Sequence, residues 1–290
     1  MTDNIIIVGA PRSGTNMLRD VLTSLPGVAT WPCDEINLLW KHHNRAFPSD
    51  ELTPAHATPS VQKYMHKKFE RIAKRFDADT VVEKTCATSM RVAFTAKLFP
   101  DAKYVFIRRD GLDAAASTMK RWDASFDLRY VAKKLRYAPF ADLPFYGGQF
   151  VSKRIASRRA QGEGADSATR KVDSWWGPRP NDFRQLQERH TLDELAILQW
   201  QRCIEASMTD LAALPTDQVF EIAYEPFVAD PVAHLEELLA FLGKSALMDP
   251  AAIHHVSSES VGKGRAALSE DSARRLSELA GPTLSKLGYA

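Results

Sequence analysis

The stretch IIIVGAPRSGTNML, residues 5–18, decides the fold. Its first four residues are apolar and β-branched without polar alternation, which is typical of a strand buried on both faces of a parallel sheet. Gly9 then opens a tight loop, and Ser13-Gly14-Thr15 leads into a segment with apolar residues at helical spacing. A strand, a glycine loop and a helix start gather backbone N–H groups around one point. The stretch therefore predicts a site for a phosphate-like anion.

The loop differs from that of Mg²⁺-dependent nucleoside triphosphatases in the position of its cation. Those enzymes carry G-x-x-x-x-G-K-[ST], whose Lys contacts the β- and γ-phosphates and whose hydroxyl holds Mg²⁺. Gly9 and Gly14 have the same separation here, but Thr15 replaces the Lys and the cation lies earlier, at Arg12. Because an arginine fork grips an anion directly, the loop favours a ligand other than a nucleoside triphosphate, bound without a metal.

The residues G-A-P-R-S-G-T at 9–15 resemble the 5′-phosphosulfate loop of the sulfotransferase family, which uses 3′-phosphoadenosine 5′-phosphosulfate (PAPS) as donor. On this motif alone, another kind of P-loop remains the alternative. The resemblance implies an α/β fold of three αβα layers around a central parallel sheet, similar to that of P-loop nucleoside triphosphatases. It also implies that the donor is bound by Pro11, Arg12, Ser13, Gly14, Thr15 and Asn16.

A second motif follows the strand predicted by KYVFI at 103–107. Arg109 stands at the end of this strand, and Ser117 lies eight residues later in a predicted helix. Such a cation and hydroxyl can converge on one anion in the crevice where open α/β sheets hold ligands. On their own, Arg108 and Arg109 are equally consistent with ordinary surface charges. The segment R-D-G-L-D-A-A-A-S resembles the family's 3′-phosphate motif, which implies that Arg109 and Ser117 bind the donor's 3′-phosphate and that Arg121 assists.

Two later segments extend the resemblance to the carboxyl-terminal half. Y-E-P-F-V-A-D-P at 224–231 resembles a segment whose tyrosine, here Tyr224, lies near the nucleotide. S-S-E-S-V-G-K-G-R at 257–265 resembles the basic glycine loop that closes over the donor. It implies donor contacts from Lys263, Gly264 and Arg265, although Gly264 replaces the aromatic residue of many relatives.

The catalytic predictions concern the end of a strand at 80–84. V-V-E-K-T at 81–85 resembles the segment that places a catalytic Lys, here Lys84, beside the transferred group. Lys84 and Arg12 are predicted to stabilise charge on that group. Glu35 is predicted to be the base, because protein-tyrosine and several carbohydrate sulfotransferases carry a glutamate in this region and no His follows Lys84. A helix cap is the alternative role of Glu35. The rival bases are Asp34, His42 and His43.

Composition narrows the class of protein. Of 290 residues, 44% are apolar and 26% charged, as in ordinary globular proteins. The net charge of +2 argues neither for nor against a polyanionic partner, and we expect no nucleic-acid partner. The three cysteines lack a C-x-x-C pair, which favours a reducing compartment over a disulfide framework or zinc site. No apolar run reaches the roughly 18 residues of a membrane span, and only residues 1–4 precede the first strand. We therefore expect a cytoplasmic protein without a signal peptide.

The whole chain, 1–290, is predicted to be one sulfotransferase domain. Its strand-helix rhythm is interrupted at about 125–190 by a largely helical insertion, which we expect to cover the acceptor side. The insertion resembles only a bacterial subset of the family. The predicted reaction moves a sulfuryl group from PAPS to a hydroxyl or amine of a glycan, lipid or small molecule. The alternatives are a P-loop kinase and a non-catalytic nucleotide-binding module; the number of subunits is not predicted.

Overall fold

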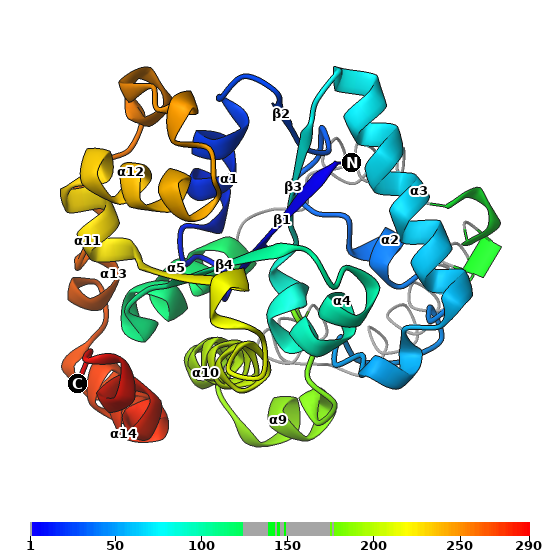
Figure 1. The fold of residues 1–290 in the computed structure, drawn as a ribbon. Coiled ribbons are helices and arrows are strands. Elements are labelled where there is room, and N and C mark those ends of the chain that lie inside the picture. Colours follow the sequence, from blue (N-terminus) through cyan, green and yellow to red (C-terminus); the bar gives the residue numbers. More distant parts are fainter. Residues whose placement is uncertain (1, 124–138, 143, 146–147, 149–174, 176) are drawn as a thin grey trace.

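The computed structural model describes residues 2–123, 139–142, 144–145, 148, 175 and 177–290 (Figure 1). Its centre is a sheet of parallel strands in the order β2-β3-β1-β4-β5. The strands are β1 (Asp3–Val8), β2 (Val28–Ala29), β3 (Thr80–Lys84), β4 (Lys103–Arg108) and β5 (Val219–Ala223). The runs that predicted buried strands therefore form this sheet.

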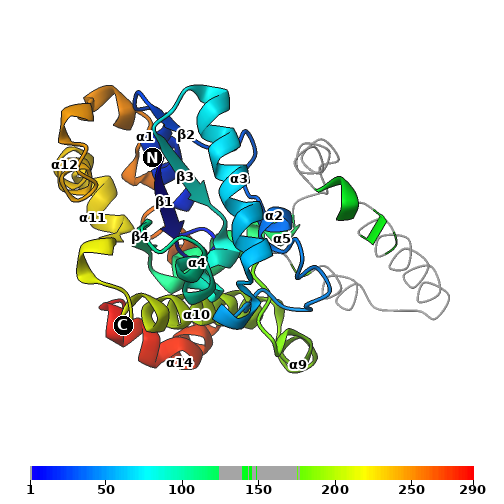
Figure 2. The same ribbon diagram turned by 45° about the vertical axis from the view of Figure 1, so that its right-hand side comes forward.

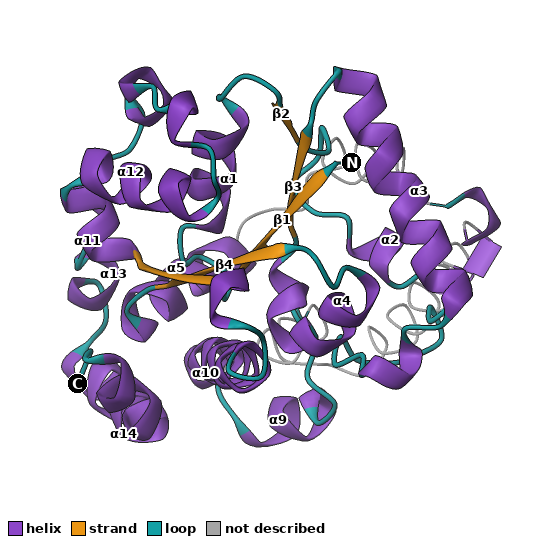
Figure 3. Ribbon diagram, in the orientation of Figure 1, coloured by secondary structure: helices purple, strands orange, loops and turns teal. Residues whose placement is uncertain are grey.

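Helices cover both faces of the sheet, which confirms the predicted three-layer fold (Figure 3). They are α1 (Thr15–Thr23), α2 (Asn37–Trp40), α3 (Pro59–Phe76), α4 (Val92–Leu98), α5 (Gly111–Asp123), α9 (Phe183–Arg189), α10 (Leu192–Leu211), α11 (Tyr224–Ala229), α12 (Pro231–Phe241), α13 (Lys263–Ala266) and α14 (Glu270–Leu287).

Strand β1 contributes to two hydrophobic cores, one on each face of the sheet. Ile6 and Val8 pack in a core with residues of α3, α4, α10 and α14. Ile5 and Ile7 point to the opposite face and pack with residues of α1, α11 and α12 (Figure 1). None of these four side chains is more than 2% exposed. An unbroken apolar run is the pattern required when alternate side chains enter two cores.

The carboxyl ends of the strands form one edge of the sheet and set the predicted site residues in a row. The loop of residues 9–14 follows β1, Lys84 ends β3, Arg109 follows β4 and Tyr224 follows β5. Because β1 lies between β3 and β4, the loop lies between Lys84 and Arg109. Neighbouring strands are about 4.8 Å apart, so β3 and β4 are separated by about 10 Å, within the span of one nucleotide.

Helix α10 packs beside α14 and supports the row from one side (Figure 2). Its start is fixed by a capping box, in which Thr191 and Glu194 satisfy each other's backbone N–H groups. Further along the helix, the buried Trp200 donates its indole N–H to the backbone oxygen of Arg109 over 3.2 Å. The helix therefore fixes the backbone at the end of β4.

Most of the predicted insertion at 125–190 lies outside the described residues, so its extent and its place over the acceptor side stay predictions. Within the described part, Trp175 is buried and donates its indole N–H to the backbone oxygen of Pro178 over 2.9 Å. Trp175 is therefore a packing residue. Among the helices that the structure describes, none has the length and apolar character needed to cross a membrane.

Candidate active site

The glycine loop after β1 and the motif after β4 meet in one place. Nε of Arg12 donates a hydrogen bond to Oγ of Ser117 over 2.9 Å, although 105 positions separate the two residues. Nη1 of Arg109 donates to the backbone oxygen of Arg12 over 3.2 Å. The structure thus brings Arg12, Arg109 and Ser117 together, so one ligand can contact both segments.

The loop has a strained backbone and a close aromatic neighbour. Arg12 has φ of 66°, a left-handed conformation that costs a non-glycine residue on the order of 1 kcal/mol and is found mainly at functional sites. Gly14 has φ of 90°, and a Cβ there would lie 2.5 Å from Cδ2 of Tyr224. Ser13 Oγ is buried without a hydrogen-bond partner among the described residues. The loop thus offers a ligand an unused polar group.

Arg109 lies between the aromatic ring of Tyr224 and the carboxyl-terminal loop. Its Cζ is 4.4 Å from the ring centroid, a cation–π distance, and Nη2 donates to the backbone oxygen of Ser260 over 2.6 Å. Asp113 forms an ion pair with the same guanidinium at 3.3 Å. Nε of Arg109 is buried and has no hydrogen-bond partner in the described part of the chain. A buried, incompletely bonded guanidinium fits an anionic group such as a phosphate.

The segment at 257–265 is fastened over this site by two side chains. Oη of Tyr224 forms a hydrogen bond with Oγ of Ser260 at 2.6 Å. The buried carboxylate of Asp113 accepts the backbone N–H groups of Gly262 over 2.7 Å and of Arg265 over 2.8 Å. Asp113 therefore joins this loop to the same helix turn that follows Arg109. Asp113 was not predicted as a site residue. Its position four residues after Arg109 was the signal that could have indicated it.

Gly264 is required by the closeness of the two segments. A Cβ at this position would lie 2.7 Å from both Cα and the backbone oxygen of Asp113, so any larger residue would force the two segments apart. Lys263 and Arg265 instead carry exposed side chains that pair with acidic neighbours at 3.8 and 3.4 Å. Donor contacts from Lys263, Gly264 and Arg265 stay predictions.

At the end of β3, Lys84 and Glu35 form the second half of the site. Nζ of Lys84 donates to Oε1 of Glu35 over 3.3 Å, and the backbone N–H of Cys86 donates to the same oxygen over 3.3 Å. The Lys84 side chain is 3% exposed and that of Glu35 is 23% exposed. Ile36, not Glu35, occupies the position before α2. The carboxylate thus contacts Lys84, in place of the alternative role as a helix cap.

Burial and nearby charges shift the pKa values of three site residues. Burial lowers the pKa of Lys84, but Glu35 and Cys86 together outweigh burial and the net shift is upward, so the ammonium is charged at neutral pH. Desolvation lowers the pKa of Arg12, and the charges of Arg109 and Arg121 lower it further. Arg121 therefore lies within electrostatic reach of the loop. Burial raises the pKa of Cys86 to about 12, which keeps this thiol protonated and unreactive.

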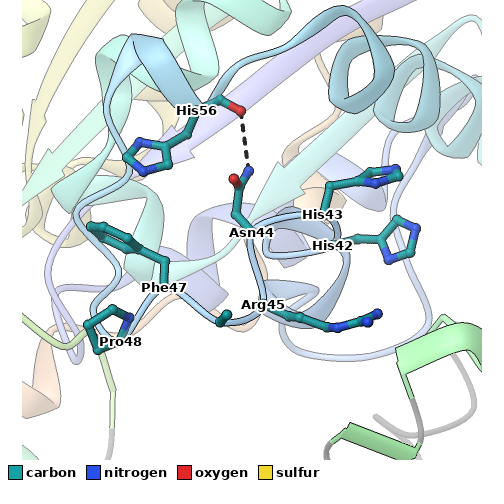
Figure 4. Close-up of a pocket in the computed structure, with 8 residues that line it drawn as sticks. His42, His43, Asn44, Arg45, Phe47, Pro48 and His56 are labelled. Carbon is teal, nitrogen blue, oxygen red and sulfur yellow. Dashed lines mark hydrogen bonds between the residues drawn. The ribbon is translucent and has the colours of Figure 1, made fainter.

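The rival candidates for the base have other partners. Asp34 lies 3.6 Å from Arg19. His42 lies 2.6 Å from the buried carboxylate of Asp142 through its Nδ1. With His43 it lines an open pocket of about 610 Å³ formed by the loop after α2 (Figure 4). Of these candidates and Glu35, it is Glu35 that contacts Lys84.

Comparison with known protein families agrees with the resemblance seen in the sequence. The sequence model described as the sulfotransferase family matches residues 4–142 and 155–247. This chain belongs to the sulfotransferase family. A comparison with curated proteins gives no significant match.

Solved sulfotransferase structures share the fold of this sulfotransferase. The sulfotransferase domain from the curacin biosynthetic pathway superposes with a TM-score of 0.52 at 15% identity, covering 100% of this chain and 99% of that one. Sulfotransferase STF9 from Mycobacterium avium gives 0.53 at 12% identity, covering 98% of this chain and 76% of that one. At such identities the likeness concerns the fold alone.

The residues that the structure describes contain no group of three or more His, Cys, Asp or Glu arranged to hold a metal ion. Pro11 lies in the loop between β1 and α1, whereas Thr15 and Asn16 begin α1. Thr15 is buried, and its Oγ1 lies 3.7 Å from Sγ of Cys86. Asn16 is exposed in the first turn of α1. The contact of Thr15 links the glycine loop to the segment that carries Lys84.

Proposed function

We propose that this sulfotransferase uses PAPS as donor and transfers its sulfuryl group to a hydroxyl or amine of a glycan, lipid or small molecule. The observation that carries the proposal is the 2.9 Å hydrogen bond from Arg12 to Ser117, because it joins the two anion-binding motifs into one site. A donor with a 5′-phosphosulfate and a 3′-phosphate has one anionic group for each motif.

The described residues fit such a donor. The loop of residues 11–16 would hold the 5′ side through its backbone N–H groups and Arg12. Arg109 and Ser117 would hold the 3′-phosphate, with Arg121 nearby and Tyr224 beneath the guanidinium. The buried Nε of Arg109 and Oγ of Ser13 supply polar atoms that lack partners in the described structure.

The sulfuryl group that PAPS supplies carries less charge than a terminal phosphoryl group, so fixed cations suffice to stabilise its transfer. Glu35 takes the proton of the acceptor hydroxyl, a role that contributes about 10²–10⁴-fold to the rate. Its hydrogen bond with Lys84, over 3.3 Å, orients this carboxylate. When Glu35 takes this proton, its carboxylate loses its charge, and the ammonium of Lys84 can then stabilise the negative charge that develops on the transferred sulfuryl group. Arg12 stabilises charge on the same group.

Two measurements test the proposal in sequence. Adenosine 3′,5′-bisphosphate (PAP) should raise the thermal unfolding temperature, since a ligand at 100 times its Kd adds about 2.7 kcal/mol of stability. ATP with Mg²⁺ serves as the comparison, and stabilisation by ATP–Mg²⁺ alone would support a kinase instead. PAPS with ³⁵S in the sulfuryl group is then supplied with a panel of phenols, sugars and long-chain alcohols. Binding of PAP without turnover on any acceptor would indicate a non-catalytic module.

We also propose a cytoplasmic location. Cys86 and Cys203 are buried thiols outside any disulfide, as expected of a protein that folds in a reducing compartment. Localisation of a tagged full-length chain tests this proposal.

A further inference from the structure

Three consecutive residues, beginning with the last residue of β3, hold the segment that carries Glu35. Nζ of Lys84 and the backbone N–H of Cys86 contact the Glu35 carboxylate, both at 3.3 Å. Between them, Oγ1 of Thr85 accepts the backbone N–H of Ile36 over 3.1 Å. The first two contacts reach the side chain of the proposed base, whereas Thr85 acts on its backbone.

Glu83 determines that Thr85 is the acceptor in its hydrogen bond with Ile36. The hydroxyl of Thr85 donates to Oε1 of Glu83 over 2.5 Å, and both residues are fully buried. A hydroxyl has one proton, so donation to Glu83 leaves its lone pairs for the N–H of Ile36. The carboxylate of Glu83 thereby sets Thr85 as an acceptor.

The backbone near Glu35 needs this support because it is irregular. Strand β2 ends at Ala29 and helix α2 begins at Asn37, and neither a helix nor a sheet ladder fixes the backbone between them. The orientation of Glu35 therefore depends on individual contacts: those from the β3 end, together with a hydrogen bond from Arg19 to the backbone oxygen of Asp34 at 3.4 Å and one from Cys33 Sγ to that of Glu35 at 3.8 Å. A displacement of about 1 Å of a catalytic group can cost about 10²-fold in rate.

We propose that Thr85, oriented by Glu83, is a positioning residue for Glu35. This inference rests on the proposed role of Glu35 as the base of sulfuryl transfer. The side-chain hydrogen bonds of Thr85 join it to Ile36 and Glu83. It acts through the N–H of Ile36, which places the neighbouring carboxylate.

Three variants of the full chain test the proposal. Thr85→Val removes the hydroxyl and keeps the shape, and Thr85→Ser restores the hydroxyl. Thr88→Val is the matched control, since Thr88 is equally buried, lies in the same short turn at Cys86–Met90, and its Oγ1 has no hydrogen-bond partner among the described residues. All three changes alter one β-branched side chain in the same small region.

The first readout is the rate of hydrogen exchange at the Ile36 amide, which is measured by NMR. Thr85→Val should speed this exchange at least tenfold, whereas Thr85→Ser and Thr88→Val should leave it near the wild-type rate. The second readout is kcat for PAPS with the best acceptor of the panel. Thr85→Val should lower kcat about tenfold to 10²-fold, with the KM for PAPS and the PAP-induced shift in Tm unchanged, and Thr85→Ser should restore it.

Unchanged exchange at Ile36 in Thr85→Val would overturn the proposal, and so would faster exchange with a normal kcat. An equal loss of kcat in Thr88→Val would also overturn it, because the effect would then come from repacking. Absence of PAPS turnover in the wild type would contradict the proposed function; the exchange measurement needs no turnover and decides the contact separately.

Discussion

Ser117 receives a hydrogen bond from Nε of Arg12 over 2.9 Å, from a loop that leaves a different strand. Strands β1 and β4 are direct neighbours in the sheet, so the loop after one and the helix after the other necessarily leave the same edge side by side. The guanidinium of Arg109 completes the junction by donating to the backbone oxygen of Arg12. Two sequence motifs about 100 residues apart are thus one structural unit.

Arg109→Ala should remove most of the stabilisation that PAP provides. The variant loses the guanidinium proposed to bind the 3′-phosphate, and a charge-assisted hydrogen bond contributes about 1.5–3 kcal/mol. It also leaves the buried Asp113 without its cation, so the variant is compared with and without PAP rather than with the wild type. Thermal unfolding with a titration of PAP gives the measurement.

Arg108→Ala is the matched control for this prediction. Arg108 is the preceding residue, but it pairs with Glu221 and donates to the backbone oxygen of Leu287, away from the donor motifs. Its PAP-induced shift should equal that of the wild type. Equal shifts in both arginine variants would contradict the assignment of Arg109.

Glu35→Gln should keep PAP binding and lower kcat about 10²–10⁴-fold. The amide retains the shape of the carboxylate but cannot accept the proton of the acceptor. The measurement is initial-rate kinetics with labelled PAPS, alongside the PAP-induced shift in Tm. Asp34→Asn is the control, because Asp34 is the adjacent acid and pairs with Arg19. A large loss in Asp34→Asn with normal rates in Glu35→Gln would move the base to Asp34.

The strands and the pairing of motifs could be predicted because their causes are local. Burial on two faces leaves an unbroken apolar run at Ile5–Val8, and the residues of the glycine loop after β1 are consecutive in the sequence. The contact of Glu35 with Lys84 was not predicted, although the family resemblance led to both residues as separate catalytic candidates. Spacing alone could not supply it, since the two residues are 49 positions apart.

The supporting residues could not be predicted, because their roles depend on distant partners. Asp113 accepts N–H groups from Gly262 and Arg265, about 150 positions later; its spacing of four residues from Arg109 indicates an ion pair but not these backbone partners. Gly264 likewise departs from the residue of many relatives, and its backbone passes Asp113 at close range. Such residues become visible only when the packed segments are known.

Gly264→Ala should weaken PAP binding and destabilise the protein by about 1–3 kcal/mol. The added Cβ would meet the Asp113 backbone at 2.7 Å, which no side-chain rotation relieves, so the loop must move away from α5. Gly281→Ala is the control for donor binding: nothing outside its chain neighbours lies within 4 Å of its Cβ position in α14, and because Pro282 follows it, alanine should alter only stability and leave the PAP affinity unchanged. Urea unfolding and PAP titration check both. Normal PAP affinity in Gly264→Ala would show that the loop does not contribute to the donor site.

Glu83→Gln should change how stability depends on pH. Burial raises the pKa of Glu83 from 4.5 to about 7, because it outweighs the Thr85 hydroxyl and the nearby positive charges of Arg91 and Lys84. The folded state therefore binds this proton more tightly than the unfolded state, so the contribution is present below pH 4.5 and is lost as pH rises through about 7.

This loss amounts to about 3 kcal/mol between those pH values, and Gln cannot show it because it does not titrate. The free energy of unfolding of Glu83→Gln relative to the wild type should therefore increase steadily from pH 5 to pH 8, as measured by urea unfolding at each pH. Glu259→Gln, at a highly exposed position, is the control and should show a nearly constant difference. A constant difference in Glu83→Gln as well would mean that this carboxyl does not take up a proton in the folded state across that range.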